Sequence, residues 1–212
     1  TDIDVVVAQF GAAAARAKAA EFDAIEIHGG HGYLLSSFIS PKTNTRTDEY
    51  GGPLENRARL LLRVIGAVRA AVGADFPVWC KIDACERGKD GGIELDHARA
   101  LAKLIEAAGV DAITVSAYHD VGQGKLHSGS NIPHQPEENI PAAAAIKAEV
   151  RVPVIASGGV EAEAGAAHIA SGKYDFLAMG RKLLADPALP KKLAGNAPES
   201  VRPCIYCYTC VS

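Results

Sequence analysis

The sequence repeats one hydrophobic pattern along its length. Alanine-rich segments with apolar residues at every third or fourth position alternate with short apolar segments that are rich in β-branched residues. The first pattern predicts amphipathic helices, and the second predicts strands that are buried on both faces. The predicted helices cover residues 3–20, 54–72, 94–108, 137–149 and 161–171, and the predicted strands cover residues 22–29, 76–84, 110–117, 152–159 and 174–181. This alternation predicts parallel βα units in an α/β fold.

Each predicted strand ends in a polar residue or in glycine. These strand-end residues are His28, Lys81, Ser116, Gly158–Gly159 and Gly180–Arg181. A (β/α)8 TIM barrel builds its active site from the carboxyl ends of its strands, so the pattern favours a barrel. The alternative, a doubly wound sheet, is disfavoured because no G-x-G-x-x-G follows the first strand. We therefore expect this chain to be a fragment that holds about five of the eight βα units of a barrel.

Composition and charge narrow the class of protein. The 212 residues suffice for one domain, and the net charge of −3 argues against nucleic acid and anionic membranes as partners. No apolar run approaches the ~20 residues that cross a bilayer, and the first residues lack the basic region of a signal peptide. The chain starts at Thr1 rather than Met, so we expect the natural N-terminus upstream. Three of the five cysteines lie within the last nine residues, which favours a metal or cluster site in a reducing, cytoplasmic compartment over disulfides.

One segment carries the strongest chemical signal. The sequence EIHGGHGYLLSSFISPKTNTRTDEYGG, residues 26–52, places His28, His31 and Tyr33 where the first strand ends. Two imidazole N–H groups can hold an oxygen atom that becomes negatively charged, and a nearby phenol can donate a proton as a general acid. Two alternatives stay open. The histidines are either metal ligands, although no third ligand is close by in the sequence, or hydrogen-bonded structural residues.

The same segment and the end of the chain resemble a known family. The segment EIHGGHGYLLSSFISPKTNTRTDEYGGPLENRARLL resembles the old yellow enzyme family of flavin-dependent ene-reductases. The tail RPCIYCYTC resembles the branch that adds an iron–sulfur cluster, typified by 2,4-dienoyl-CoA reductase and trimethylamine dehydrogenase. The resemblance covers essentially the whole chain. It implies that residues 1–200 are the C-terminal part of an FMN-binding TIM barrel, with barrel strands 4 to 8, and that residues 201–212 begin a cysteine-rich iron–sulfur segment.

The resemblance also implies an activity. Hydride would pass from reduced FMN to the activated C=C bond of an enone or enoyl thioester, with electrons from NAD(P)H. His28 and His31 would hold the carbonyl oxygen of the substrate, and Tyr33 would protonate the neighbouring carbon. His119, followed by Asp120, is similar to a pair that assists protonation in the dienoyl-CoA reductase branch; a histidine on a surface loop is the alternative. Amine oxidation of the trimethylamine dehydrogenase type and a non-catalytic barrel are the alternative functions.

The resemblance further implies residues that bind the flavin. Lys81 stands where most relatives have arginine near flavin N1; it keeps the positive charge but lacks the bidentate fork of arginine. Gly158 and Gly159, together with Gly180 and Arg181, stand where the family binds the FMN phosphate. TIM barrels commonly bind phosphate at their last two strands. The structural alternatives are an ordinary lysine at a strand end and simple glycine turns.

The last residues of the chain contain a cysteine motif. Cys204, Cys207 and Cys210 form a C-x2-C-x2-C run, which can bind one [4Fe–4S] cluster if a fourth cysteine follows outside this chain. A zinc site with four cysteines is the alternative. Two further features are compatible with the sequence: an additional domain that binds FAD, and a homo-oligomeric assembly. For the remaining histidines and cysteines we expect structural roles for His97 and His168, loop positions for His127, His134 and Cys85, and a core position for Cys80.

Overall fold

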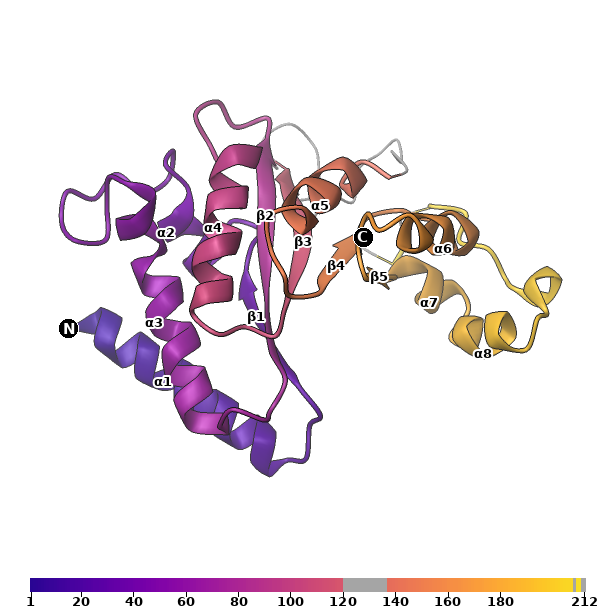
Figure 1. Ribbon diagram of the computed structural model, residues 1–212, viewed down its shortest axis with the longest axis horizontal. Coiled ribbons are helices and arrows are strands. Elements are labelled where there is room, and N and C mark those ends of the chain that lie inside the picture. The colour runs from indigo at the N-terminus through magenta and orange to yellow at the C-terminus, as the bar shows by residue number, and fades with distance from the viewer. Residues whose placement is uncertain (120–136, 208, 211–212) are drawn as a thin grey trace.

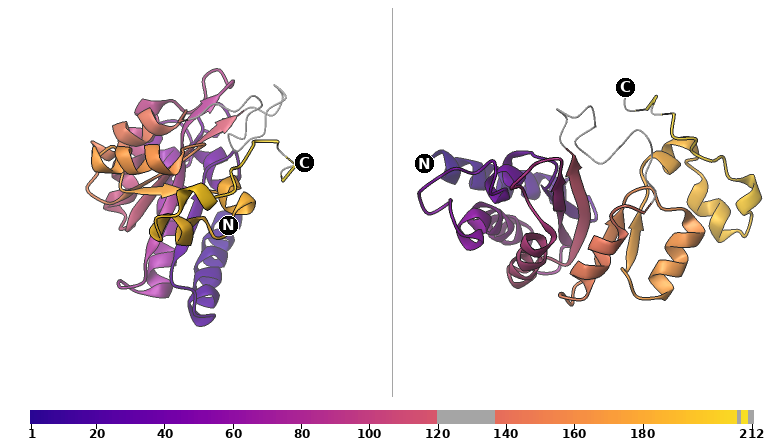
Figure 2. Two further views of the ribbon diagram at one scale, coloured as in Figure 1. Left: turned by 90° about the vertical axis from the view of Figure 1, so that its right-hand side faces the viewer. Right: turned by 90° about the horizontal axis from the view of Figure 1, so that it is seen from above.

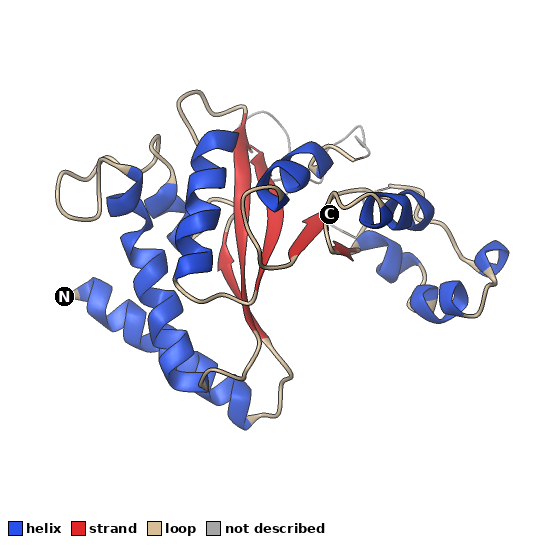
Figure 3. Ribbon diagram, in the orientation of Figure 1, coloured by secondary structure: helices blue, strands red, loops and turns tan. Residues whose placement is uncertain are grey.

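The computed structural model describes residues 1–119, 137–207 and 209–210, and this part of the chain forms a parallel five-stranded sheet with helices between the strands (Figures 1 and 3). The strands are β1 (Ile25–Gly29), β2 (Val78–Arg87), β3 (Ala112–His119), β4 (Val154–Ser157) and β5 (Phe176–Ala178). The longer helices are α1 (Asp2–Ala19), α3 (Leu54–Val72), α4 (Leu95–Ala107), α5 (Ile140–Lys147) and α6 (Ala162–Ala170). The shorter ones are α2 (Leu34–Ile39), α7 (Arg181–Ala185), α8 (Leu189–Ala194) and the 3₁₀ helix η2 (Pro198–Ser200). The predicted α/β fold with a parallel sheet is confirmed.

The strands lie in the sheet in the order in which they occur in the chain. Each strand pairs in parallel with its chain neighbour, from β1 to β5. Helix α1 packs against α3, α3 against α4, and α4 against α5, while α4 contacts β2 and α5 contacts β4. Figure 2 shows these helices as one layer on one side of the sheet. A doubly wound sheet reverses its strand order and carries helices on both faces. The described strands show no such reversal, which disfavours that alternative.

The two faces of the sheet are buried to different extents. Ile27, Cys80 and Ala156 belong to the core that the sheet forms with the helices, and each is at most 2 % exposed. On the other face Glu26 and Phe176 are exposed, and β3 is the strand that is buried along most of both faces. The prediction of burial on both faces is therefore wrong for β1 and β5, which contain exposed residues, whereas the uncovered face of β4 is half-buried. The physical reason is that the helices of the described chain cover one face of the sheet.

Several element boundaries differ from the predicted ones. Strand β2 continues to Arg87 through an irregular register between Asp83 and Glu86. Cys85, predicted in a loop, therefore lies in this strand, whereas Cys80 is in the core as predicted. Helices α2, α7, α8 and η2 have at most six residues each, and such short helices depend on tertiary contacts that the sequence pattern does not reveal. Within the described ranges no helix combines the length and the apolar character that crossing a membrane requires.

The histidines remote from the strand ends have structural contacts. His97 Nδ1 accepts a hydrogen bond from the Glu94 backbone N–H at 3.3 Å, which caps the start of α4. His168 in α6 lies 3.2 Å from Oε2 of Glu137. Both contacts are consistent with the predicted structural roles. The remaining predicted loop histidines, His127 and His134, and also Asp120, lie outside the described residues.

Candidate active site

Three aromatic side chains meet at the carboxyl end of β1. The ring centroids of His28 and His31 are 4.9 Å apart with their planes at 72°, and those of His28 and Tyr33 are 5.4 Å apart. His28 belongs to β1, whereas His31 lies in the turn that follows and Tyr33 caps the start of α2. The structure thus brings these three predicted residues together. The group can offer imidazole N–H donors and a phenol proton to one small molecule.

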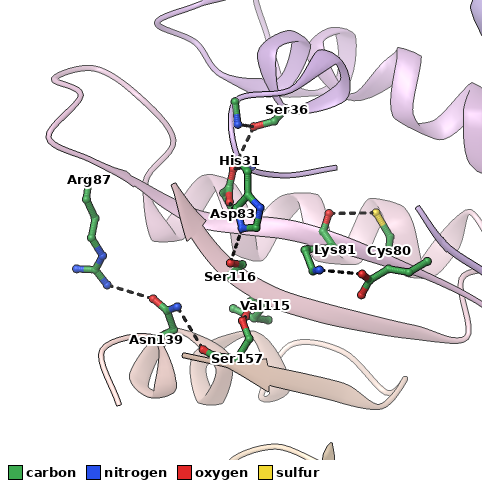
Figure 4. Close-up of polar contacts among 12 residues, drawn as sticks. His31, Ser36, Cys80, Lys81, Asp83, Arg87, Val115, Ser116, Asn139 and Ser157 are labelled. Carbon is green, nitrogen blue, oxygen red and sulfur yellow. Dashed lines mark hydrogen bonds and ion pairs between the residues drawn. The ribbon is translucent and has the colours of Figure 1, made fainter. Parts of the chain in front are cut away.

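The turn that presents His31 rests on Asp83 of β2 (Figure 4). His31 has a left-handed φ of 62°, and the backbone N–H of this residue donates to Oδ2 of Asp83 at 2.6 Å. The Ser36 hydroxyl donates to the same oxygen at 3.1 Å. Gly32 has a φ of 72°, and a Cβ at that position would come within 2.8 Å of the Tyr118 ring. Position 32 therefore favours glycine in this turn.

The charge of Asp83 is strongly affected by its surroundings. The residue is 1 % exposed, and this burial raises the pKa of its carboxyl to about 7, although hydrogen bonds from His31 and Ser36 act in the opposite direction. Oδ1 of Asp83 lies 4.0 Å from Nε2 of His31. That nitrogen is also 2.7 Å from the Ser116 hydroxyl, and the tautomer of the ring decides which of the two donates. A carboxyl that titrates near neutral pH therefore lies beside a predicted catalytic imidazole.

Lys81 lies next to a second carboxylate. Its Nζ is 2.8 Å from Oε2 of Glu26, and the two residues belong to the neighbouring strands β2 and β1. Oε1 of Glu26 accepts hydrogen bonds from Thr114 at 2.6 Å and from Trp79 at 2.9 Å. Burial would raise the pKa of Glu26, but the hydrogen bonds from Lys81, Thr114 and Trp79 hold it below its usual value. Glu26 is therefore a carboxylate at neutral pH and partly balances the charge of Lys81.

A cavity of about 480 Å³ lies over the face of the sheet that carries Glu26 and Lys81 and reaches the carboxyl ends of the strands. Among the residues that line it are six of those predicted from the sequence: His31, Lys81, Gly158, Gly159, Gly180 and Arg181. His28 and Tyr33 are not among the lining residues, but His28 is in ring contact with His31. The cavity therefore connects the histidine turn at β1 with the glycine loops at β4 and β5.

The glycine loop after β4 brings bare backbone close to the cavity. Gly158 and Gly159 both have positive φ, 118° and 62°. A Cβ on Gly158 would lie 3.0 Å from Nδ2 of Asn139, and that amide donates to the Ser157 carbonyl at 3.2 Å. Backbone in this conformation can approach a ligand more closely than backbone that carries side chains.

Comparison with known proteins establishes the family. The model of the NADH:flavin oxidoreductase / NADH oxidase family matches residues 1–200. The chain belongs to this family. A curated relative, the NADH oxidase of Thermoanaerobacter brockii, is 40% identical over 207 residues, which make up 97% of this chain and 31% of the relative.

Two solved structures are similar to this flavin oxidoreductase chain. A 2-naphthoyl-CoA reductase in complex with 2-naphthoyl-CoA has a TM-score of 0.91 and 28% identity, and the match covers 98% of this chain and 31% of that chain. A histamine dehydrogenase from Rhizobium sp. 4-9 has a TM-score of 0.86 and 30% identity, with 99% of this chain and 30% of that chain covered. This chain thus spans about a third of the length of each of these three proteins.

The residues of the cavity fit the flavin of the NADH:flavin oxidoreductase family. Three cations line the cavity: Lys81 lies on β2, and Arg181 and Lys182 lie after β5, three strands away in the sheet. The glycine loop after β4 lies between β2 and β5 in the strand order. A side chain on Gly158 in this loop would contact Asn139. The volume also lies within the ~300–1,000 Å³ of small-molecule and cofactor pockets. A polyanionic, planar cofactor is therefore compatible with this lining.

His119 lies at the end of β3 and is fully buried. Its Nε2 is 3.7 Å from Oε2 of Glu138, whose other carboxylate oxygen forms an ion pair with Arg87 at 3.1 Å. The alternative of a histidine on a surface loop is therefore wrong, because packing against the segment before α5 covers this strand end. His119 is not among the residues that line the cavity.

The predicted cluster ligands lie at the end of the chain in a segment without helix or strand among its described residues. Cys204 is half-buried, whereas Cys207 and Cys210 are exposed. Within the part of the chain that the structure describes, no three His, Cys, Asp or Glu side chains are grouped so that they could hold a metal ion. Tyr206 attaches this segment to the cavity, because its ring lies 5.2 Å from the Arg181 guanidinium and lines the cavity wall.

The sequence patterns did not identify five residues that shape this site. These residues are Glu26, Asp83, Ser116 as a partner of His31, Asn139 and Tyr206. Glu26 stands two positions before His28, and Asp83 stands two positions after Lys81. Because strand residues two apart share a face, this spacing was the available signal for both carboxylates. The contacts of Asn139 and Tyr206 join distant segments and have no such local signal.

Proposed function

We propose that this chain is the C-terminal part of an FMN-binding (β/α)8 barrel, with barrel strands 4 to 8 in residues 1–200 and the start of an iron–sulfur segment in residues 201–212. The consecutive strand order supports this proposal, as does the single layer of helices on one side of the sheet. The cavity at the carboxyl ends of the strands is where a barrel enzyme has its active site.

We further propose that the whole protein reduces a C=C bond conjugated to a carbonyl group, as in an enone or an enoyl thioester, with electrons from NAD(P)H. The contact of His28, His31 and Tyr33 beside the cavity is the observation that carries this proposal. Similarity to a 2-naphthoyl-CoA reductase in complex with the acyl thioester 2-naphthoyl-CoA supports it. When bound, reduced FMN would supply the hydride.

The residues of this chain would act on the substrate at two positions. His28 and His31 would donate ring N–H groups to the carbonyl oxygen, which gains negative charge as the hydride arrives at the conjugated carbon. The Tyr33 side chain is exposed beside His28, so its hydroxyl is accessible to the carbon that needs a proton. His119 with Glu138 would assist protonation through an intervening group, because its side chain is fully buried and does not line the cavity.

The flavin would bind along the cavity. Lys81 would lie near N1 of the isoalloxazine ring, where a cation favours the reduced flavin. Gly158, Gly159, Gly180 and Arg181 would hold the phosphate through backbone N–H groups and the guanidinium. The closeness of these residues to one cavity supports this arrangement.

Amine oxidation is the second candidate, and similarity to a histamine dehydrogenase favours it. The paired histidines favour reduction of a conjugated carbonyl instead. An amine that loses hydride develops positive charge on its nitrogen, and two N–H donors beside that nitrogen would oppose this charge. A non-catalytic barrel is the third candidate, and the intact ring cluster argues against it.

The cysteine segment would bind a [4Fe–4S] cluster in the whole protein, with Cys204, Cys207 and Cys210 as three of its ligands. The support is their spacing together with the attachment of Tyr206 to the cavity wall. Analysis of the anaerobically purified whole protein should find about four irons per chain. Stoichiometric zinc without acid-labile sulfide would favour the zinc alternative. An additional FAD domain stays part of this proposal for the route from NAD(P)H.

Anaerobic half-reactions of the whole protein separate the candidate functions. The flavin should be reduced by NADH or NADPH and then reoxidised by an enoyl thioester such as crotonyl-CoA. Reduction of the flavin by histamine or trimethylamine, with no reoxidation by an unsaturated carbonyl compound, would establish amine oxidation instead. Failure to bind FMN would support the non-catalytic barrel.

A further inference from the structure

We propose that Asp83 is the positioning residue of His31: its carboxylate holds the turn that presents this imidazole to the cavity and controls the charge of the ring. The inference rests on the proposed function only for what His31 does to a substrate. The contacts themselves join β2 to the turn after β1 and need neither flavin nor substrate.

The carboxylate binds the turn at His31, whose backbone has a left-handed conformation. Oδ2 of Asp83 accepts the His31 backbone N–H at 2.6 Å, and a left-handed φ of 62° is unfavourable for a residue with a side chain. Gly30 precedes His31, and a Cβ on Gly30 would come within 3.0 Å of Oδ1 of Asp83. The turn therefore fits closely over this carboxylate. The Ser36 hydroxyl of α2 donates to the same carboxylate oxygen.

The same carboxylate reaches the imidazole through its second oxygen. Oδ1 of Asp83 lies 4.0 Å from Nε2 of His31, inside the protein, where the interaction of charges is stronger than in water. In register, Asp83 pairs with Ser116 of β3, whose hydroxyl is 2.7 Å from the same imidazole nitrogen. The His31 ring thus has the Ser116 hydroxyl within hydrogen-bond distance and the Asp83 carboxylate nearby, and Figure 4 shows the contact between His31 and Ser116.

Two charged groups besides His31 affect the pKa of Asp83. Glu86, three residues further along β2, raises the pKa of Asp83, and Lys89 in the loop after β2 lowers it. From α2 the neighbour is the hydroxyl of Ser36, and from β1 it is the imidazole of His28. Ser36, and Ser116 on β3, carry no charge. Asp83 is therefore the carboxylate in position to stabilise a protonated His31.

Charge on Asp83 should therefore be coupled to charge on His31. An ionised carboxylate favours the imidazolium form, and a protonated carboxyl does not. Two groups that interact this closely titrate as a pair, so both should respond to pH over one shared range. In the proposed reaction this coupling would keep an N–H donor on the ring when the substrate oxygen becomes negative.

NMR titration of ¹³C,¹⁵N-histidine-labelled protein tests the assignment without substrate or flavin. In Asp83→Asn, which keeps the shape of the side chain, the pH midpoint of the His31 ring resonances should fall by at least about one unit. Glu86→Gln is the matched control, because Glu86 is also a buried carboxyl on β2 but binds Ser40 and Lys89 rather than His31. It should shift that midpoint much less.

An unchanged His31 midpoint in a folded Asp83→Asn protein would overturn the proposal, as would an equal shift in Glu86→Gln. If Asp83→Asn does not fold, the wild-type protein decides the question. In protein that also carries ¹³C-labelled aspartate, the Asp83 carboxyl carbon and the His31 ring should then show a common titration step near pH 7. Independent titration of the two groups would overturn the proposal. Because this readout involves no turnover, it can succeed even if the proposed reaction is wrong.

Discussion

Two carboxyl groups in the candidate active site have opposite pKa shifts, and the hydrogen-bond donors around them explain the difference. Glu26 interacts with Lys81, Thr114 and Trp79, and these contacts together outweigh its burial. Asp83 accepts hydrogen bonds from His31 and Ser36, and burial dominates there, so its pKa rises to about 7. One group is therefore a permanent charge at neutral pH, while the other responds to pH in the range in which enzymes work.

The raised pKa of Asp83 predicts how stability depends on pH. Its folded-state value of about 7 lies above the usual 3.8. Between these values the native protein holds a proton that the unfolded chain has lost, so the contribution of this group to the free energy of unfolding falls as pH rises. Asp83→Asn removes this pH-dependent contribution to the free energy of unfolding. Between pH 5 and pH 8 the wild type should therefore lose ~2–3 kcal/mol relative to the variant, measured by urea unfolding. Parallel pH profiles for the two proteins would contradict this pKa shift.

The pair of Glu26 and Lys81 predicts a change in flavin potential. If Lys81 lies near flavin N1, Glu26→Gln leaves its positive charge uncompensated and stabilises the reduced flavin. The midpoint potential of bound FMN in the whole protein should rise by on the order of 30 mV. Trp79→Phe is the matched control, because it removes a hydrogen bond to Glu26 but no charge. Equal potentials in Glu26→Gln and wild type would place Lys81 away from the flavin ring.

Contacts between distant segments account for most of what the sequence did not reveal about single residues. His28, His31 and Tyr33 could be predicted as a group because six positions contain all three. Asp83 is 52 residues away from His31, and only the parallel pairing of β1 with β2 brings them together. A sequence pattern shows the face of a strand on which a residue lies but not which distant turn rests on it.

At the scale of elements, the order of helices and strands followed from hydrophobic periodicity, whereas the ends of elements did not. Strand β2 extends past an irregular register to Arg87, and this extension gives the ion pair of Arg87 with Glu138. The short helices after β5 and the segment that carries Cys204, Cys207 and Cys210 lack a hydrophobic periodicity of their own. The position of that segment depends on Tyr206, whose ring also lies 5.3 Å from the Lys182 ammonium, and this lysine forms an ion pair with Glu161.

The contact of Tyr206 with two cations predicts that the cysteine segment supports flavin binding. Tyr206→Ala removes two cation–π contacts, each worth ~0.5–1 kcal/mol, and opens the cavity wall near Arg181. The Kd for FMN of the whole protein, measured by quenching of flavin fluorescence, should rise several-fold. Ile205→Ala is the matched control, because Ile205 is the preceding residue and is 78% exposed. A similar Kd for Tyr206→Ala and Ile205→Ala would remove Tyr206 from the site.

At the scale of the whole molecule, the sheet presents one covered and one open face. The helices cover one face, and polar side chains of the strand ends line the cavity on the other. The sequence predicted a barrel with missing strands from the polar end of each strand. Two findings are consistent with that prediction. The chain belongs to the NADH:flavin oxidoreductase family, and it matches about a third of a longer relative.

An open cavity predicts weak flavin binding by the 212-residue chain alone. If further barrel strands complete the cavity, the whole protein should bind FMN at least about tenfold more tightly than this chain, since each ~1.4 kcal/mol of additional contact changes Kd tenfold. Fluorescence titration of both proteins with FMN measures the ratio. Equal affinities would show that the described cavity is already complete, and the proposed partial barrel would be wrong.

The most direct test of the central claim is the anaerobic reoxidation of reduced FMN by an enoyl thioester, followed by stopped-flow absorbance in the whole protein. If His31 holds the substrate oxygen and Tyr33 supplies the proton, His31→Ala should slow this step by ~10²–10³, as the loss of one oxyanion donor does. Tyr33→Phe should slow it without weakening substrate binding, and flavin reduction by NAD(P)H should stay near the wild-type rate in both variants. Reoxidation at the wild-type rate in both variants would contradict the account.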